Sequence, residues 1–290
     1  MTATIWDPST GQLLHRLTGF GGVLHAVAFS PDGRLLTTGD RAGMIRIWEV
    51  GTWQELPAPA HEIGSQIWSV AFSPDGRYFA ACGIPGGVVL WRIAFRPASA
   101  GQKALLTLEK VARLADRETM FLCFSPGSDL LVWCSGPTAY LWELGNSRPR
   151  PSLTAQLVSP MLSLAFRPDG KQAALIGPAL TPEVWDVTSG QKLFSCPGGA
   201  PNGRRSATIA SVIALSADGR WLAQQGMAVK VWDLESRKLL LVLPEEHGTP
   251  WCLAWSPNNE LLAVGSEHGG IALWNLPKIK EQLVGIGLGW

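Results

Sequence analysis

Few residues of this chain have the types and spacing that catalysis or metal binding requires. The five histidines are His15, His25, His61, His247 and His268. No two of them have the spacing that metal ligands usually show. The sequence also lacks a zinc-protease pattern, a glycine-rich phosphate loop and a nucleophile elbow. We therefore expect no metal, no cofactor and no catalytic residue.

The bulk composition predicts a globular protein without a strong electrostatic partner. The 290 residues are 46% hydrophobic and 16% charged, and the formal net charge is +1. Such a balance gives no general attraction to nucleic acid or to an anionic membrane. No apolar run reaches the roughly 18 residues that span a bilayer, and residues 1–7 show no signal peptide.

The cysteines indicate a reducing compartment. The chain has five, Cys82, Cys123, Cys134, Cys196 and Cys252. Their number is odd, no two form a Cys-x-x-Cys pair, and four of the five lie in apolar runs. We expect free, mostly buried thiols and a cytoplasmic protein.

A tryptophan ends an apolar, strand-like run at a regular period along the whole chain. The steps between these tryptophans are 42, 43, 51, 43, 47 and 42 residues. Asp or Glu follows five of the seven tryptophans, which are Trp6, Trp48, Trp91, Trp142, Trp185, Trp232 and Trp274. A period of this length predicts a repeat architecture.

A second motif recurs in phase, about nineteen residues before each tryptophan. It reads Phe-Ser-Pro-Asp-Gly at 29–33 and at 72–76, with weaker copies that begin at Phe124, Phe166, Leu215 and Trp255. Proline presets φ, aspartate bonds the nearby backbone and glycine tolerates positive φ, so the motif predicts a tight turn between two buried strands. Each repeat then holds about four short strands.

The two motifs together resemble the repeats of the WD40 family over residues 2–276. The resemblance implies an all-β fold, a WD40-type β-propeller with four antiparallel strands per blade. We expect this propeller over residues 1–276. In it, the seven repeat-ending tryptophans would fill the gaps between neighbouring blades.

The sequence departs from the family pattern inside the blades and at the first repeat. The aspartate that the family often carries six residues before the tryptophan is replaced in every repeat, for example by Ala42 and Pro85. We therefore expect packing to replace the family's hydrogen-bond network. The Trp6 repeat has only its third and fourth strands, which predicts seven blade positions with an incomplete first blade. Six closed blades are the alternative, if residues 11–17 complete the Trp274 blade.

Residues 277–290 have the pattern of a short amphipathic helix. Pro277 suits a first helical turn, and Ile279, Leu283 and Ile286 recur at helical spacing. The tail resembles those of many bacterial WD40 proteins, which implies a cap on the last blade; a partner-binding helix is the alternative. The incomplete first blade suggests a piece of a longer, bacterial protein.

The resemblance also places a candidate binding surface. In the family, partners often bind around the central channel, where the first strand of each blade starts. The residues four positions before the Phe of the turn motif are His25, Trp68, Met120, Leu162, Ser211 and Trp251. Arg41, before a third strand, would add a polar contact. Trp and Met are enriched in interface centres. If the strand phase is off by one, the same side chains pack between blades instead.

Two functions remain open at this point. The first is a non-catalytic, monomeric scaffold that docks a peptide or loop of a partner protein on the channel-mouth face, as a module of a larger regulatory protein. The second is a propeller enzyme or small-ligand binder, which would need three or more ionisable groups that converge at the channel mouth.

Overall fold

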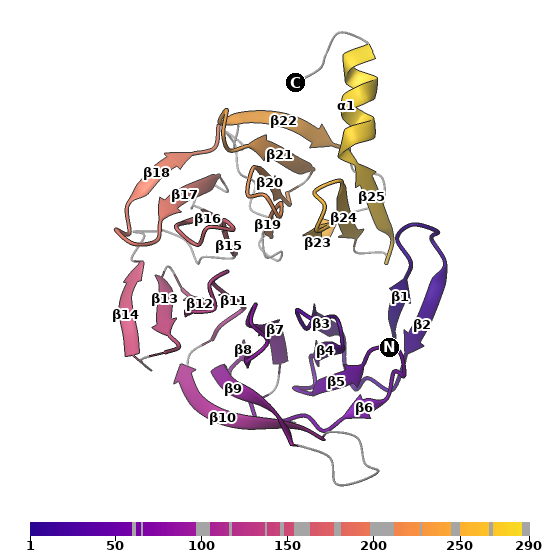
Figure 1. The fold of residues 1–290 in the computed structure, drawn as a ribbon, viewed down its shortest axis with the longest axis vertical. Helices are drawn as coiled ribbons and strands as arrows, with labels where there is room; N and C mark the ends of the chain where they lie inside the picture. The colour runs from indigo at the N-terminus through magenta and orange to yellow at the C-terminus, as the bar shows by residue number, and fades with distance from the viewer. Residues whose placement is uncertain are drawn as a thin grey trace. The chain divides into compact units, whose positions relative to one another are not determined.

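The computed structural model describes residues 1–59, 62–64, 66–96, 105–115, 118–136, 138–145, 148–153, 163–176, 181–197, 212–226, 228–244, 250–266 and 269–285. The chain divides into two compact units, Met1–Ser152 and Leu153–Trp290. Each unit consists of small antiparallel sheets (Figure 1).

The described part of unit 1 contains one two-stranded and three four-stranded sheets. The two-stranded sheet pairs β1 (Ala3–Trp6) with β2 (Leu13–Leu17). The first four-stranded sheet contains β3 (Leu24–Phe29), β4 (Leu35–Asp40), β5 (Ile45–Glu49) and β6 (Glu55–Leu56). The second contains β7 (Gln66–Phe72), β8 (Tyr78–Ile84), β9 (Gly87–Arg96) and β10 (Leu105–Ala115). The third contains β11 (Phe121–Phe124), β12 (Leu130–Ser135), β13 (Thr138–Glu143) and β14 (Arg148–Leu153).

The described part of unit 2 contains two four-stranded sheets, a three-stranded sheet and a helix. The first sheet contains β15 (Leu164–Phe166), β16 (Gln172–Ile176), β17 (Pro182–Asp186) and β18 (Lys192–Ser195). The second contains β19 (Ile213–Leu215), β20 (Trp221–Gln224), β21 (Val229–Asp233) and β22 (Lys238–Leu243). The third contains β23 (Pro250–Trp255), β24 (Leu261–Ser266) and β25 (Ile271–Asn275), and α1 (Leu276–Gly285) follows.

The Ser-Pro-Asp-Gly motif forms the predicted turn between the first two strands of a sheet. The Ser73 hydroxyl donates to Asp75 Oδ1 at 2.6 Å and accepts from the Tyr78 amide at 2.9 Å. Gly76 has φ 70°, a conformation that glycine adopts without a steric penalty. The same two serine bonds recur around Ser30 in the first four-stranded sheet, so the local motif fixes the hairpin.

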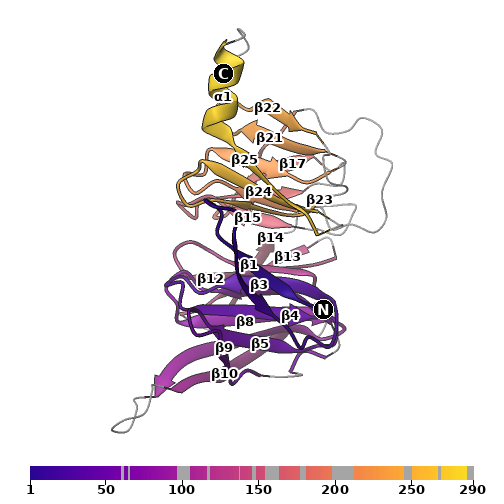
Figure 2. The ribbon, with the colours of Figure 1, turned by 90° about the vertical axis from the view of Figure 1, so that its right-hand side faces the viewer.

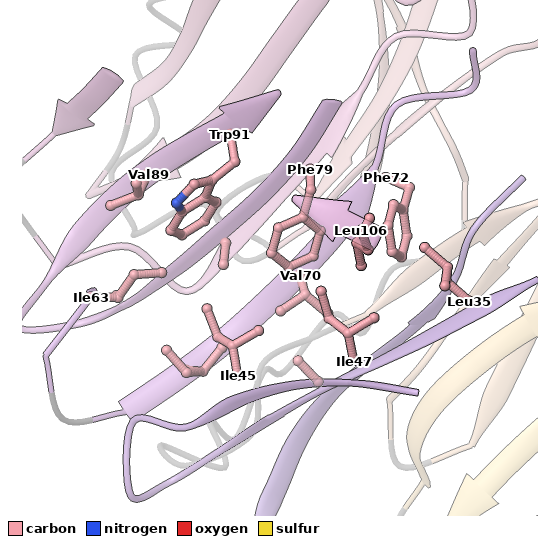
Figure 3. Close-up of a cluster of buried hydrophobic side chains, with 13 residues drawn as sticks. Leu35, Ile45, Ile47, Ile63, Val70, Phe72, Phe79, Val89, Trp91 and Leu106 are labelled. Atoms are coloured by element: carbon pink, nitrogen blue, oxygen red, sulfur yellow. The ribbon is translucent and has the colours of Figure 1, made fainter. Parts of the chain in front are cut away.

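Alternating apolar residues pack neighbouring sheets together. In unit 1, Ile45 and Ile47 of β5 pack with Val70 of β7 and with Phe79 and Trp91 of the same sheet as β7 (Figure 3). Phe79 and Trp91 are 0% and 1% exposed. Burial of side chains of this size is the main stabilising term of such a fold.

The β9–β10 pair is the longest in unit 1, and Figure 2 shows it projecting from that unit.

This arrangement confirms the predicted fold class. Successive antiparallel sheets, each with the strand order of a propeller blade, carry the repeats, and a short helix ends the described chain. The two-stranded β1–β2 sheet matches the incomplete first blade. The number of blade positions in the closed ring, seven or six, stays a prediction, as does the division at residues 276 and 277; α1 begins at Leu276.

The repeat-ending tryptophans differ in burial. Trp48, Trp91 and Trp232 are buried, Trp142, Trp185 and Trp274 are half-buried, and Trp6 is 45% exposed. The Trp48 side chain also forms a hydrogen bond within its sheet, because its Nε1 donates to Thr38 Oγ1 at 3.4 Å. In that blade, a hydrogen bond between β5 and β4 therefore accompanies the packing of the tryptophan.

Candidate protein-docking surface

Two of the predicted binding residues contact each other in unit 1. His25 of β3 and Trp68 of β7 are both half-buried. Their ring centroids lie 4.3 Å apart at an interplanar angle of 85°, an edge-to-face arrangement. The Trp68 Nε1 atom is buried and has no hydrogen-bond partner among the described residues. Such a pair brings two neighbouring sheets together at the start of their first strands.

Arg41 lies beside this pair and changes its electrostatics. It follows β4, its side chain is exposed, and its backbone amide donates to the Val23 carbonyl at 2.8 Å. Burial lowers the pKa of His25, and the positive charge of Arg41 lowers it further, while Asp40 acts in the opposite direction. The imidazole is therefore held in its neutral form at pH 7, and Arg41 supplies the exposed positive charge.

Asp40 holds the turn that contains Arg41, and the sequence reasoning did not single it out. Its Oδ1 accepts hydrogen bonds from the amides of Ala42 and Met44, both at 2.9 Å, and the residue is 1% exposed. Its Oδ2 is buried without a partner among the described residues. The sequence signal that could have found it is an aspartate at the end of an apolar, strand-like run and three residues before Gly43, because such an aspartate often bonds the backbone of the turn that follows.

The remaining predicted residues are more scattered. Met120 is 40% exposed and immediately precedes β11 in unit 1, while Trp251 is 49% exposed in β23 of unit 2. Leu162 and Ser211 lie outside the described residues. The structure thus brings together His25, Arg41 and Trp68, and it leaves the complete ring untested.

The described residues offer little reactive chemistry. No group of three or more His, Cys, Asp or Glu side chains that could hold a metal occurs among them. Burial raises the pKa of Cys134 to about 12, and it raises the pKa of Cys82 well above its ordinary value. Thiols with such pKa values carry almost no thiolate at neutral pH and are poor nucleophiles.

Comparison with known proteins assigns the repeats. The model of the family "WD domain, G-beta repeat" matches residues 11–49, 55–92 and 237–275. Each segment contains the last strand of one sheet (β2, β6 or β22) and the first three strands of the next sheet, the third of which carries Trp48, Trp91 or Trp274. These three segments of the chain are similar to WD40 repeats, and together they make up less than half of its 290 residues. No helix in the described part of the chain is long and apolar enough to cross a membrane.

Several curated proteins are similar to this chain. Telomerase protein component 1 of Mus musculus is 27% identical over 93% of the chain, a region that makes up 10% of the mouse protein. The small ribosomal subunit proteins RACK1 of Caenorhabditis elegans and RACK1y of Oryza sativa subsp. japonica are 27% and 30% identical, over 49% and 47% of the chain and 45% and 40% of their own lengths. The chain thus spans about a tenth of the mouse telomerase protein and less than half of either RACK1 protein.

Proposed function

We propose that this WD40 chain is a non-catalytic scaffold that docks a peptide or loop of a partner protein. The docking surface centres on His25, Arg41 and Trp68, and it extends to Met120. The observation that carries the proposal is the contact between His25 and Trp68, beside an exposed arginine.

The chemistry of this surface suits protein recognition. Trp, Met and Arg are the residue types that interface centres favour, because they bury large areas and also form polar contacts. Since His25 is held neutral and the Asp40 carboxylate is buried, Arg41 is the exposed charged group beside the rings. It favours a peptide that carries an acidic side chain next to an apolar one.

The relatives agree with a role in an assembly. Their names describe a component of telomerase and a protein of the small ribosomal subunit. WD40 propellers in general hold protein partners. We extend this to the present chain as a monomer, acting as a module of a larger regulatory protein.

The alternative function, a propeller enzyme or small-ligand binder, has less support. It needs three ionisable groups that converge and are free to react. His25, Arg41 and Asp40 do lie close together, but the Asp40 carboxylate is 1% exposed and is bonded by the amides of its own turn. Asp40 therefore acts as a structural group, and only two ionisable side chains remain for a ligand.

A random peptide library displayed on phage tests the proposal, because it requires no partner to be chosen in advance. We expect selection on the intact chain to enrich peptides with adjacent acidic and apolar residues. Arg41→Ala should weaken their binding about tenfold, equal to roughly 1.4 kcal/mol. Arg34→Ala is the matched control, because its side chain is 84% exposed in another turn of the same sheet.

Two further variants locate the surface. Met120→Ala and Trp68→Phe should both weaken binding of the selected peptides while the urea midpoint stays near that of the wild type. If no peptide is enriched, or if Arg41→Ala and Arg34→Ala bind the peptides equally well, the proposed surface is wrong.

A further inference from the structure

β9 is the longest third strand of the described sheets, because the chain does not turn after Trp91. β9 has ten residues, whereas β5, β13, β17, β21 and β25 have five or six. β17 and β21 end at Asp186 and Asp233, whose Oδ1 atoms accept hydrogen bonds from the amides two and three residues ahead. The residue at this position of β9 is Arg92, which has no acceptor for such amides. The strand therefore continues through residues 93–96, the β9 extension, which pairs with β10.

The β9 extension carries an apolar face beyond Trp91. Ile93 and Phe95 alternate with Trp91 and therefore lie on the same face of the strand. They are paired with Leu108 and Leu106 of β10. Ile93 and Leu108 pack against the buried cluster of unit 1. Leu106 is 3% exposed, but Phe95 is 59% exposed, so the face ends in an exposed aromatic ring.

This face lines a groove together with two copies of the turn motif. The groove has a volume of about 480 Å³ and lies between the β9 extension and the turns that join β3 to β4 and β7 to β8. Its apolar lining consists of Pro31, Leu35, Pro74, Ile93 and Phe95. Ligand sites usually have volumes of roughly 300–1,000 Å³, so the groove is large enough to hold side chains of a partner. All of its residues belong to unit 1.

The charged side chains that line the groove are those of Asp32 and Asp75. Asp75 Oδ2 accepts a hydrogen bond from Arg77 Nε at 2.5 Å. Asp32 Oδ2 lies 3.8 Å from Arg34 Nε, which is too far for a hydrogen bond, and the Arg34 side chain is 84% exposed. The Ser30 hydroxyl holds the pKa of Asp32 below its ordinary value, so the carboxylate is ionised at pH 7. Asp32 therefore offers a negative charge to a ligand in the groove.

We propose that this groove binds an extended segment of a partner protein in which an arginine or lysine adjoins a bulky apolar residue. The apolar side chain packs on Pro31, Pro74 and Phe95, and the basic side chain pairs with Asp32. Burial of the apolar side chain provides affinity, while the charge pair selects the partner. The site uses no residue of the surface around Arg41, and it prefers peptides of the opposite charge.

The charge of the groove and the exposed aromatic ring favour a protein segment over other ligands. The two carboxylates repel the phosphates of a nucleic acid. A small molecule buries most of its surface in its site, whereas Phe95, which is 59% exposed, continues the apolar surface beyond the groove. An extended segment covers both. A second copy of this chain is the remaining occupant, and sedimentation distinguishes it.

A random peptide library displayed on phage, with the intact chain as bait, tests the proposal. We expect it to yield a class of peptides with adjacent basic and apolar residues, whose affinity is then measured with labelled synthetic copies by fluorescence anisotropy. Phe95→Ser should weaken their binding at least tenfold while the urea midpoint stays near that of the wild type. Val111→Ser, at a residue that is 40% exposed on β10, is the matched control and should not weaken it.

The charge pair is tested in the same assay with Asp32→Asn. Asparagine keeps this turn, because Asn258 Oδ1 accepts from the serine hydroxyl of its own turn at 2.6 Å, as Asp32 Oδ1 does. The substitution should therefore weaken binding about fivefold without unfolding the turn. Asp218→Asn makes the same change in a turn of unit 2 and should leave binding unchanged. Arg34→Ala removes a competing cation and should strengthen binding about twofold.

Four results decide between this site and the alternatives. Absence of basic and apolar peptides from the selection would overturn the proposal, even if acidic peptides for the Arg41 surface are recovered. Equal binding by Asp32→Asn and Asp218→Asn, or by Phe95→Ser and Val111→Ser, would also overturn it. A dimer in sedimentation that Phe95→Ser dissociates would show that a second copy of the chain occupies the groove. Recovery of basic peptides alone would support this site and contradict the surface around Arg41.

Discussion

Replacing Ser73 with alanine removes the hydroxyl that holds the turn between β7 and β8. Ser73 is 0% exposed. Its Oγ donates to Asp75 Oδ1 at 2.6 Å and accepts from the Tyr78 amide at 2.9 Å. The alanine keeps the backbone and its φ, so the change isolates these two bonds.

The expected loss is about 2 kcal/mol of unfolding free energy. A buried hydrogen bond contributes roughly 1 kcal/mol net, and two are removed. The Tyr78 amide then has no side-chain acceptor, and if water does not reach it the loss rises to about 3 kcal/mol. An effect of this size exceeds the roughly 0.5 kcal/mol that is usual for surface substitutions.

Urea unfolding at pH 7 measures this loss, and Ser9→Ala is the matched control. Ser9 Oγ also donates to an aspartate two residues away, Asp7 Oδ1, at 2.6 Å, but the turn is exposed. We expect Ser9→Ala to change the free energy by less than about 0.5 kcal/mol. Equal losses in the two variants would refute the claim that burial gives the serine bond its value.

The pH dependence of Ser73→Ala gives a second check. Burial acts to raise the pKa of Asp75, but the hydroxyl of Ser73 and the amide and side chain of Arg77 together hold it below its ordinary value of 3.8. A lowered carboxyl pKa stabilises the folded state above that value, and the gain is lost as the pH falls through the folded pKa. The difference between wild type and variant should therefore shrink below pH 3.8. A constant difference down to pH 2 would contradict this assignment.

Two further predictions concern unit 2. Arg237 has φ 58°, and its guanidinium lies 4.6 Å from the Phe194 ring centroid. Arg237→Ala should lose the roughly 0.5–1 kcal/mol of this contact and keep the unfavourable φ, so Arg237→Gly should be about 1 kcal/mol more stable in urea than Arg237→Ala; equal midpoints would contradict this. Asp233 is 3% exposed, and its Oδ2 accepts a hydrogen bond from Arg220 Nη2 at 2.9 Å. Burial raises its pKa, but the bond to Arg220 and two backbone amides keep it low, so Asp233→Asn should cost about 2 kcal/mol at pH 7 and should flatten the loss of stability below pH 3.8.

The sequence was sufficient for the repeats because their signals are local. Proline, aspartate and glycine in the turn motif act within four residues, and apolar alternation identifies the strands beside them. The same local logic located His25 and Trp68 from their distance to the motif. It did not show that the two rings touch, since that contact joins separate sheets.

Residues other than glycine at positive φ show where local reasoning fails. The described chain has four, Trp53, Ser128, Arg237 and Asn259, with φ between 56° and 62°. Each reaches the preceding sheet with its side chain. Trp53 stacks on His15, Arg237 lies over Phe194, Ser128 Oγ accepts from the Asp75 amide, and Asn259 Oδ1 accepts from the Asp218 amide. A contact between sheets offsets the backbone penalty, and no short window of sequence contains both partners.

Val27 and Val70 show the division between sequence and tertiary structure most directly. The sequence alone determined that both lie in a first strand, two residues before the Phe of the same turn motif, because strand and turn preferences are local. Only the tertiary structure decided that Val70 is 7% exposed and Val27 is 65% exposed. Burial depends on the neighbouring sheet, and β3 has no complete sheet before it.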